Sequence, residues 1–334
     1  MIKMENKIGA AVIGVGRYGE THVRAYKKSP LVKLVAIWSR SEERAKKIGE
    51  KYNCEYTTNL EKIAQDKRVK IVSIATPDFA HTMPAIKMLR AGKHVLIEKP
   101  MAMSVDKCKK ILKISRENNL KLMVNFHNRW YPPVVEAKRR LDRGEIGKVV
   151  AVYARLSDRV EVPTQWLLSW ASKSGPQWFL FPHIIDLVNW LTGKQKVRRV
   201  YALGKKEVLE KRGIDTYDAV QAQVEFEETI AVFESSWILP SSWRNLIDFK
   251  IDLVGSQGKI EIVGDKEGIN IVTEKYETPF VLDPITEEEP INYFIDCILN
   301  DKEPICSGKD GLEVTKIIEA IVKSLDKGCV VEVI

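Results

Sequence analysis

The sequence predicts an α/β protein in which a doubly wound parallel sheet is followed by an α+β part with a large, mostly antiparallel sheet. In the first third, short apolar segments alternate with amphipathic helical segments, which is typical of strands and crossover helices. From about residue 149, apolar and polar residues alternate with a period of two, which is typical of half-buried strands. At 334 residues the chain exceeds the usual range of a single core. We therefore expect two domains, residues 1–126 and residues 127–334.

The first predicted strand, residues 8–13, is almost wholly apolar, as expected of a strand that is buried on both faces. The segment Gly14-Val15-Gly16-Arg17-Tyr18-Gly19 follows directly and leads into a helical pattern. In such a turn the first glycine permits a tight bend, the second lets the backbone approach a pyrophosphate, and the third allows close helix packing. The helix amino terminus then supplies N–H donors to the anion. We predict a dinucleotide site that includes Gly14, Gly16, Arg17, Tyr18 and Gly19.

The second predicted strand, residues 34–38, ends where an NAD-type site carries an acid for the ribose 2′-hydroxyl. Ser39 and Arg40 stand there instead, and Arg44 follows one helical turn later. A hydroxyl and guanidinium groups suit a 2′-phosphate, so the pattern favours NADP(H), with NAD(H) as the second choice. The alternative is that both arginines are solvated residues at a helix start, beside two glutamates.

The carboxyl ends of two later strands carry further candidates. Thr76 and Pro77 follow an apolar run and lie where a cofactor ribose passes. Glu98 and Lys99 follow the run 94–97, and an ammonium group there can polarise a carbonyl or hold an alcohol. The remaining strands of this sheet are expected at residues 55–56, 71–75 and 120–126, and helices at residues 42–51 and 59–65 and after Ser104. This makes a parallel sheet of about six strands.

In the second part, apolar residues alternate with polar ones over residues 220–226 and 247–253. On the second of these strands we expect Ile247 and Phe249 to be buried in the same way as Ile251 and Leu253. Such strands form a mostly antiparallel sheet with one face on a core and the other on water or a second subunit. A closing helix is predicted over residues 309–327.

Composition excludes several classes of protein. Apolar residues make up 45% of the chain and charged residues 29%, no apolar stretch approaches 18 residues, and no cleavable signal pattern is present, so we expect a cytoplasmic protein without membrane contact. The net charge of +8 is spread through helices with no basic aromatic stripe, which argues against nucleic acid as a partner. The five cysteines show no paired C-x-x-C spacing, so we predict neither a disulfide framework nor a metal site.

Several short motifs occur together with the glycine turn. They are Ala75-Thr76-Pro77 followed by His81, Ala91-Gly92-Lys93-His94 continuing into Glu98-Lys99-Pro100, Asn128-Arg129-Trp130 before Pro132, Gly144-Glu145-Ile146-Gly147, His183-Ile184-Ile185-Asp186 and Gly255-Ser256-Gln257-Gly258. With these motifs the whole chain resembles the Gfo/Idh/MocA oxidoreductases, a family that includes glucose-fructose oxidoreductase and inositol dehydrogenase. The resemblance implies a Rossmann domain and hydride transfer between NAD(P) and a hydroxyl carbon of a sugar, cyclitol or related polyol.

The resemblance places Lys99 and His183 near the reacting centre. A histidine has an ordinary pKa of about 6.5, which suits a proton shuttle. The Lys99 ammonium can hydrogen-bond the same oxygen and stabilise a developing alkoxide, or act as the base itself if burial lowers its pKa. The sequence leaves these two roles open. We assign Glu98, Lys99 and His81 to the cofactor side of the site, and expect His22 and His94 to be structural.

The substrate side is assigned to residues of the second part and to the strand end before it. His127 and Arg129 follow a strand end and are expected to enter the site. Asp186 shares a helix face with His183, and either orients that histidine or interacts with the helix dipole. Indole faces that suit the apolar face of a sugar ring are offered by Trp166, Trp170 and Trp178.

One position departs from the family pattern, because Phe179 stands four residues before His183 where the family often carries an aspartate. Either Lys99 and His183 act beside an aromatic wall, or the hydride chemistry is weakened or lost. The alternatives to a sugar dehydrogenase are a glycosidase that recycles NAD, a catalytically silent sensor that binds cofactor and a partner protein, and an enzyme for an aromatic diol or a biliverdin-like ligand. We expect a homodimer or homotetramer formed through the open face of the second sheet.

Overall fold

The structure is a computed structural model that describes residues 7–167, 169–264, 268–279 and 287–333. Its residues divide into two compact units. The first unit contains Met1–His127 and Thr286–Leu312, and the second contains Asn128–Ile285 and Glu313–Ile334. None of the helices in the described part of the chain is both long and apolar enough to cross a membrane.

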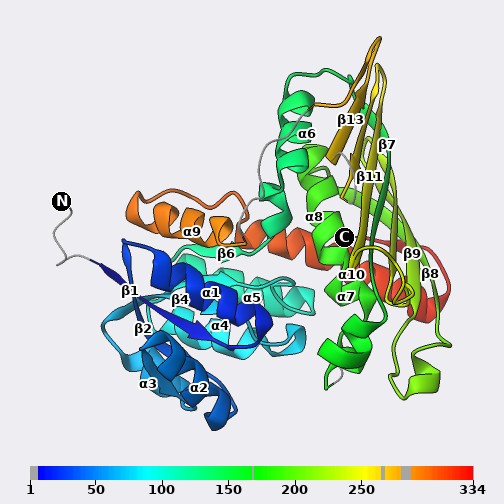
Figure 1. Cartoon of the computed structure of the whole chain (residues 1–334). Helices are drawn as coiled ribbons and strands as arrows, with labels where there is room; N and C mark the ends of the chain where they lie inside the picture. The colour runs from blue at the N-terminus through cyan, green and yellow to red at the C-terminus, as the bar shows by residue number, and fades with distance from the viewer. Residues whose placement is uncertain (1–6, 168, 265–267, 280–286, 334) are drawn as a thin grey trace. The chain divides into compact units, whose positions relative to one another are not determined.

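The first unit is built on a six-stranded parallel sheet with the strand order β3-β2-β1-β4-β5-β6 (Figure 1). The strands are β1 (Ile8–Ile13), β2 (Val32–Trp38), β3 (Glu55–Thr57), β4 (Val69–Ile74), β5 (His94–Ile97) and β6 (Leu122–Val124). The central strands are mostly apolar because helices cover both faces of such a sheet, and Val12, Val72 and Leu96 are fully buried. The predicted doubly wound parallel sheet is confirmed.

Three of the six helices named for this unit begin at a capping side chain. They are α1 (Arg17–Lys28), α2 (Glu42–Tyr52), α3 (Leu60–Gln65), α4 (Thr82–Arg90), α5 (Val105–Glu117) and α9 (Glu289–Leu299). Ser41, Asn59 and Ser104 each accept a hydrogen bond from a backbone amide in the first turn of α2, α3 and α5. Helices α1, α4 and α9 begin without a side-chain cap, and α1 differs from the other two because the residue at its cap position, Gly16, has no side chain.

The second unit is built on a nine-stranded sheet with the order β14-β13-β12-β11-β7-β10-β9-β8-β15 (Figure 1). Its strands are β7 (Val149–Asp158), β8 (Val197–Lys205), β9 (Ala219–Phe226), β10 (Ile230–Ser236), β11 (Ile247–Gly255), β12 (Lys259–Val263), β13 (Gly268–Val272), β14 (Tyr276–Glu277) and β15 (Val331–Glu332). All neighbours pair antiparallel except β10 and β7, which are parallel. The predicted, mostly antiparallel sheet is confirmed.

Helices pack on one face of this sheet. They are α6 (Pro132–Asp142), α7 (Pro176–Phe179), α8 (Phe181–Leu191) and α10 (Gly308–Lys327), whose first residues belong to the first unit. On β9 the residues that face the core are Val220, Ala222, Val224 and Phe226, as predicted. The expectation for β11 is wrong at its start, because Ile247 is 43% exposed while Asp248 is buried. Asp248 is covered because Arg155 of β7 lies 2.9 Å from its carboxylate.

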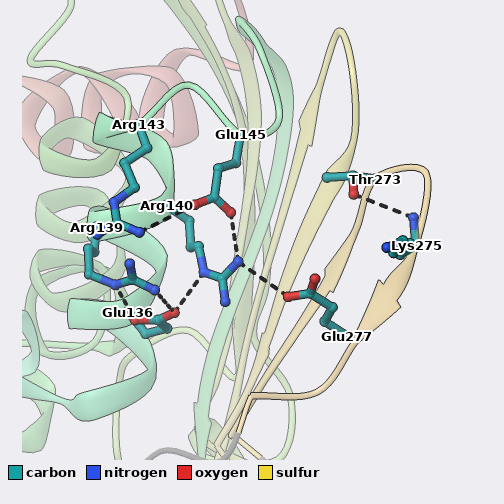
Figure 2. A network of polar contacts seen from close by, with 8 residues as sticks. All are labelled: Glu136, Arg139, Arg140, Arg143, Glu145, Thr273, Lys275 and Glu277. Carbon is teal, nitrogen blue, oxygen red and sulfur yellow. Dashed lines mark hydrogen bonds and ion pairs between the residues drawn. The ribbon is translucent and has the colours of Figure 1, made fainter.

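The opposite, outer face of the sheet carries polar residues together with exposed apolar ones, among them Leu203 of β8, Ile230 of β10 and Val254 of β11. A charged network anchors α6 to the edge of the same sheet (Figure 2). Arg140 contacts Glu136 at 2.7 Å, Glu145 at 2.7 Å and Glu277 of β14 at 3.3 Å. One guanidinium group therefore joins a helix, the loop after it and the last strand of the sheet edge.

Candidate active site

The glycine turn between β1 and α1 contains glycines of two kinds. A side chain at Gly14 would meet the Ala75 carbonyl oxygen at 2.5 Å, and one at Gly19 would meet the Gly14 carbonyl oxygen at 1.9 Å. A side chain at Gly16 would meet no atom within 4 Å. The packing of the protein therefore requires Gly14 and Gly19, whereas the open space at Gly16 leaves room for a bound group.

The start of α1 lies directly behind this space. Gly16 occupies the cap position and offers no side-chain acceptor, so the amides of the first turn, which includes Arg17 and Tyr18, are not capped by a side chain. Uncapped amides at a helix amino terminus attract an anion through N–H donors and the helix dipole. These residues fit the pyrophosphate of a dinucleotide.

The end of β2 presents hydroxyl and guanidinium groups and no carboxylate. The Ser39 hydroxyl is buried and accepts a hydrogen bond from the Ser41 amide at 3.2 Å. Arg40 and Arg44 are exposed, and neither forms an ion pair with any residue that the structure describes. Arg44 lies in the first turn of α2, whose amino terminus adds its own preference for an anion. The residues present fit a phosphate on the ribose.

The loops after β4 and β5 are joined by His81. Its ring is fully buried, with Nδ1 2.7 Å from the Pro100 carbonyl oxygen and Nε2 2.8 Å from the Thr76 carbonyl oxygen. The ring therefore ties Thr76 and Pro77 to the loop that carries Lys99. A direct contact of His81 with a cofactor stays a prediction. The Thr76 hydroxyl is buried and finds no hydrogen-bond partner among the described residues, so it is available to a ligand.

Glu98 and Lys99 end β5 and are both buried. Glu98 Oε1 accepts hydrogen bonds from His22 Nε2 at 2.8 Å and from Asn125 Nδ2 at 2.6 Å. Burial acts to raise the pKa of Glu98, but the hydrogen bond and charge of His22 outweigh it and lower this pKa to about 2. Glu98 is therefore ionised at neutral pH. The peptide bond between Lys99 and Pro100 is cis.

A small pocket opens within the first unit beside the ends of β5 and β6. It is lined by Tyr18, Thr21, His22, Glu98, Asn125, His127 and Glu287. Of these, Tyr18, Glu98 and His127 were predicted to belong to a site, and His22 was expected to be only structural. Thr21, Asn125 and Glu287 were not predicted. Asn125 could have been found from the sequence, because it directly follows β6 and ligands bind at the carboxyl ends of the strands in such a sheet.

In the second unit, His183 lies in the first turn of α8 and is buried. Asp186, one turn later, receives two hydrogen bonds from Arg129, with Nε at 2.8 Å and Nη2 at 2.6 Å. Arg129 also stacks over the Trp190 ring at 5.2 Å. Both side chains of the pair are 1% exposed, so the arrangement favours a positioning role for them. Orientation of His183 by Asp186 and substrate contact by either residue stay predictions.

The predicted tryptophan platform divides by burial. Trp166 is 43% exposed, Trp170 is half-buried and Trp178 is buried. Phe179 packs between Trp170, at 6.0 Å between ring centroids, and Trp237, at 5.6 Å. An aromatic wall therefore exists at the position of Phe179. The Trp237 indole donates a hydrogen bond to Asp158 at 3.2 Å, which places a buried carboxylate next to this wall.

The two predicted catalytic residues belong to different units, since Lys99 lies in the first and His183 in the second. Their pairing at one reacting centre therefore stays a prediction. No group of histidine, cysteine and carboxylate side chains suited to a metal ion is found in the described part of the chain.

Two profiles of one protein family match the chain. The oxidoreductase family with an NAD-binding Rossmann fold, Gfo/Idh/MocA, matches residues 8–126, and its C-terminal domain matches residues 134–261. The chain belongs to the Gfo/Idh/MocA oxidoreductase family. Its resemblance to this family and its fold class are thereby confirmed.

Among Gfo/Idh/MocA proteins, scyllo-inositol 2-dehydrogenase (NAD(+)) of Bacillus subtilis is 25% identical over 324 residues, which cover 92% of this chain and 91% of that enzyme. Inositol 2-dehydrogenase of Rhizobium meliloti is 26% identical and covers 94% of this chain and 96% of its own. In structure, a candidate NADPH-dependent oxidoreductase from Desulfitobacterium hafniense superposes with a TM-score of 0.85 at 26% identity, covering 99% of both chains.

Levoglucosan dehydrogenase in complex with NADH and levoglucosan superposes with a TM-score of 0.86 at 23% identity, covering 98% of this chain and 99% of its own. At this identity the likeness shows the Gfo/Idh/MocA fold alone. The N-terminal unit is thus an NAD-binding Rossmann domain of an oxidoreductase family.

Proposed function

We propose that this protein transfers a hydride between a nicotinamide cofactor and a hydroxyl carbon of a sugar, cyclitol or related polyol. Full-length relatives are named as inositol dehydrogenases, which supports this substrate class. The observation that carries the proposal is the glycine turn, where Gly14 and Gly19 serve packing and Gly16 keeps a space that the protein itself does not use. When bound, the nicotinamide supplies the acceptor or donor of the hydride.

The chain supplies proton transfer and charge stabilisation. Lys99 is a buried cation at the end of β5, where it can bind the substrate oxygen and stabilise negative charge on it. His183 is the candidate base for the hydroxyl proton, since a neutral imidazole can accept a proton near neutral pH. Thr76 and the first turn of α1 bind and orient the cofactor. These assignments are our proposal for the site.

We further propose NADP(H) as the preferred cofactor and NAD(H) as the second. The support is chemical, because Arg40 and Arg44 are exposed cations without an ion-pair partner among the described residues, and the two residues directly after β2 are Ser39 and Arg40 rather than a carboxylate. The relatives include an enzyme named for NAD(+) and a candidate NADPH-dependent oxidoreductase, so both choices occur among similar proteins.

For assembly and location, we propose a cytoplasmic homodimer or homotetramer. The exposed apolar residues on the outer face of the second sheet support association through that face. The dehydrogenase names of the full-length relatives do not favour a recycling glycosidase or a silent sensor.

The proposal is tested by titrating the cofactor-free protein with NADPH and NADH, followed by a screen of sugars, inositols and other polyols for reduction of the oxidised cofactor. We expect tight binding and turnover. Lys99→Met and His183→Ala should each lower turnover by about a hundredfold or more, because general acid–base catalysis contributes that much. Cofactor affinity should change far less, and Lys47→Met, at an exposed lysine, should change neither.

Three outcomes would contradict the proposal at different points. Absence of cofactor binding would remove the dinucleotide site. Tight binding with no turnover on any polyol would favour the sensor or the recycling glycosidase. Unchanged turnover in the two variants would remove Lys99 and His183 from the mechanism while leaving the dehydrogenase in place.

A further inference from the structure

The pocket at the ends of β5 and β6 contains a buried amide that is only half satisfied. Asn125 is 4% exposed, and its Nδ2 donates to Glu98 Oε1 at 2.6 Å. Its Oδ1 is buried and has no hydrogen-bond partner among the residues that the structure describes. Buried amide oxygens are almost always paired, with protein or with ordered water, and Asn125, unlike other residues with such an oxygen, lines this pocket, so a bound ligand can supply the donor.

The other polar groups of the pocket are mainly acceptors as well. Glu98 uses Oε1 for both of its hydrogen bonds, so its second oxygen is left without a donor in the described part of the chain. Glu287 contributes a second carboxylate, and the Thr21 hydroxyl donates to it at 3.1 Å. A pocket with this set of groups attracts N–H donors and repels a carboxylate or phosphate.

The place of the pocket in the sheet identifies the donor. In a parallel sheet of the order 3-2-1-4-5-6 a dinucleotide lies across the carboxyl ends, with one mononucleotide on each side of the switch between β1 and β4. Arg40 and Arg44, which we predict to bind the 2′-phosphate of the adenosine ribose, lie on the β2 side of this switch. The β5 and β6 side is therefore left for the nicotinamide. Its carboxamide is a neutral planar group with two N–H donors.

We infer that Asn125 Oδ1, together with Glu98, accepts the N–H groups of the nicotinamide carboxamide and thereby positions the ring. The inference rests on the proposed function and adds a residue to it. Asn125 is a cofactor-specificity residue, since it requires an amide and rejects a ring whose substituent lacks an N–H donor.

A buried chain of hydrogen bonds holds Glu98 in place for this role. Tyr26 lies 2.7 Å from the Ser73 hydroxyl, Ser73 lies 2.9 Å from His22 Nδ1, and His22 Nε2 donates to Glu98. Burial raises the pKa of Tyr26, so its hydroxyl stays protonated and enters this chain as a neutral group. Because Glu98 is ionised, His22 Nε2 carries the proton of the hydrogen bond between them. His22 is a positioning residue that acts through Glu98.

The test compares three ligands by calorimetric titration, all with the same group at the ribose 2′ position. They are the reduced nicotinamide dinucleotide, its reduced 3-acetylpyridine analogue, in which a methyl group replaces the amide nitrogen, and ADP-ribose, which lacks the ring. For the wild-type protein we expect the acetyl analogue to bind about tenfold more weakly than the nicotinamide form, which corresponds to about 1.4 kcal/mol.

The variant Asn125→Ala should remove this discrimination, so that both reduced dinucleotides bind within about twofold of each other. Its affinity for ADP-ribose should match that of the wild type, which also shows that the variant is folded. Asn189→Ala is the matched control, because Asn189 of α8 is likewise a buried amide whose Oδ1 has no hydrogen-bond partner among the described residues. It should keep the tenfold preference.

The outcomes separate this inference from the function on which it rests. If the wild type binds the acetyl analogue as tightly as the nicotinamide form, or if Asn125→Ala keeps the preference, the inference is wrong although dinucleotide binding stands. The wild-type comparison decides the matter even if the variant fails to fold. If the wild type binds neither ADP-ribose nor the dinucleotide, the proposed function itself fails.

Discussion

Gly16 is the residue of the glycine turn beside which the protein leaves a space that a ligand can fill. Its φ of −75° is ordinary for any residue, and a side chain there meets no protein atom. Gly19 differs, because a side chain there would strike the backbone of Gly14. Experiment can therefore distinguish Gly14 and Gly19, which the fold requires, from Gly16, which we assign to cofactor binding.

Gly16→Ala should leave stability within about 0.5 kcal/mol of the wild type, because nothing in the fold contacts the new methyl group. It should weaken binding of both NADH and NADPH by about tenfold or more, because the methyl group occupies the space for the pyrophosphate. Gly19→Ala should instead destabilise the protein by about 2 kcal/mol or more through overpacking. Thermal unfolding and cofactor titration measure the two effects, and unchanged affinity in Gly16→Ala would contradict the assignment.

Arg40→Ala should weaken NADPH binding by about tenfold and leave NADH binding within about twofold, because only the 2′-phosphate gains a charge-assisted hydrogen bond from this side chain. The comparison is made by titrating both cofactors into each variant. Arg90→Ala is the matched control, because Arg90 is also exposed and without an ion-pair partner in the described part of the chain. An equal loss for both cofactors would refute the phosphate assignment.

At the scale of elements, buried polar links connect loops and helices that the sequence separates. His81 connects the loops after β4 and β5, and Arg129 connects the segment after β6 to α8 through Asp186. Each link fixes a loop that carries a proposed site residue to a rigid element. Breaking the Arg129 pair at one partner leaves a buried charge, which costs more than the pair contributes.

The network around α6 predicts a pH dependence (Figure 2). The hydrogen bond from Arg139 is the largest cause that lowers the pKa of Glu136 to about 2, and Arg140 adds to it. Because the folded pKa lies below the unfolded one, Glu136 stabilises the protein fully above about pH 5, and this contribution is lost as the pH falls toward 2. We expect a loss of about 1 kcal/mol between pH 5 and pH 3 that is missing in Glu136→Gln.

Urea unfolding at pH 7, 5 and 3 measures this difference. Glu43→Gln, at an exposed glutamate without an ion-pair partner among the described residues, should keep the dependence of the wild type. If Glu136→Gln loses stability with falling pH as steeply as the wild type, the network does not stabilise the fold in the way that we argue.

At the scale of the whole molecule, the outer face of the nine-stranded sheet is the feature that the single chain leaves unexplained. Leu203 is 59% exposed, Ile230 62% and Val254 41%, and they lie on three strands of one sheet. Light scattering should give two or four times the chain mass of 38.1 kDa. Ile230→Glu should lower that mass by placing a charge in the interface, whereas Met83→Glu, at an exposed residue of the first unit, should not. A monomeric wild type would overturn this proposal.

The sequence by itself determined the two sheets, because the local hydrophobic pattern reports whether a strand is buried on both faces or on one. It also determined the glycine turn, the loops after β4 and β5, and the family, since these depend on residues that are close in the chain. It was wrong at Ile247 and Asp248, where a cross-strand partner reversed the alternation.

Only the tertiary structure decided how residues from distant segments pair. It brought His22, Glu98 and Asn125 into one hydrogen-bonded group, and it paired Asp186 with Arg129 in a buried ion pair. It also showed that the protein's own atoms crowd Gly14 and Gly19 but leave the space beside Gly16 open. The physical reason is that periodicity follows from the geometry of one segment, whereas a buried polar group must find its partner in space, at whatever distance along the chain.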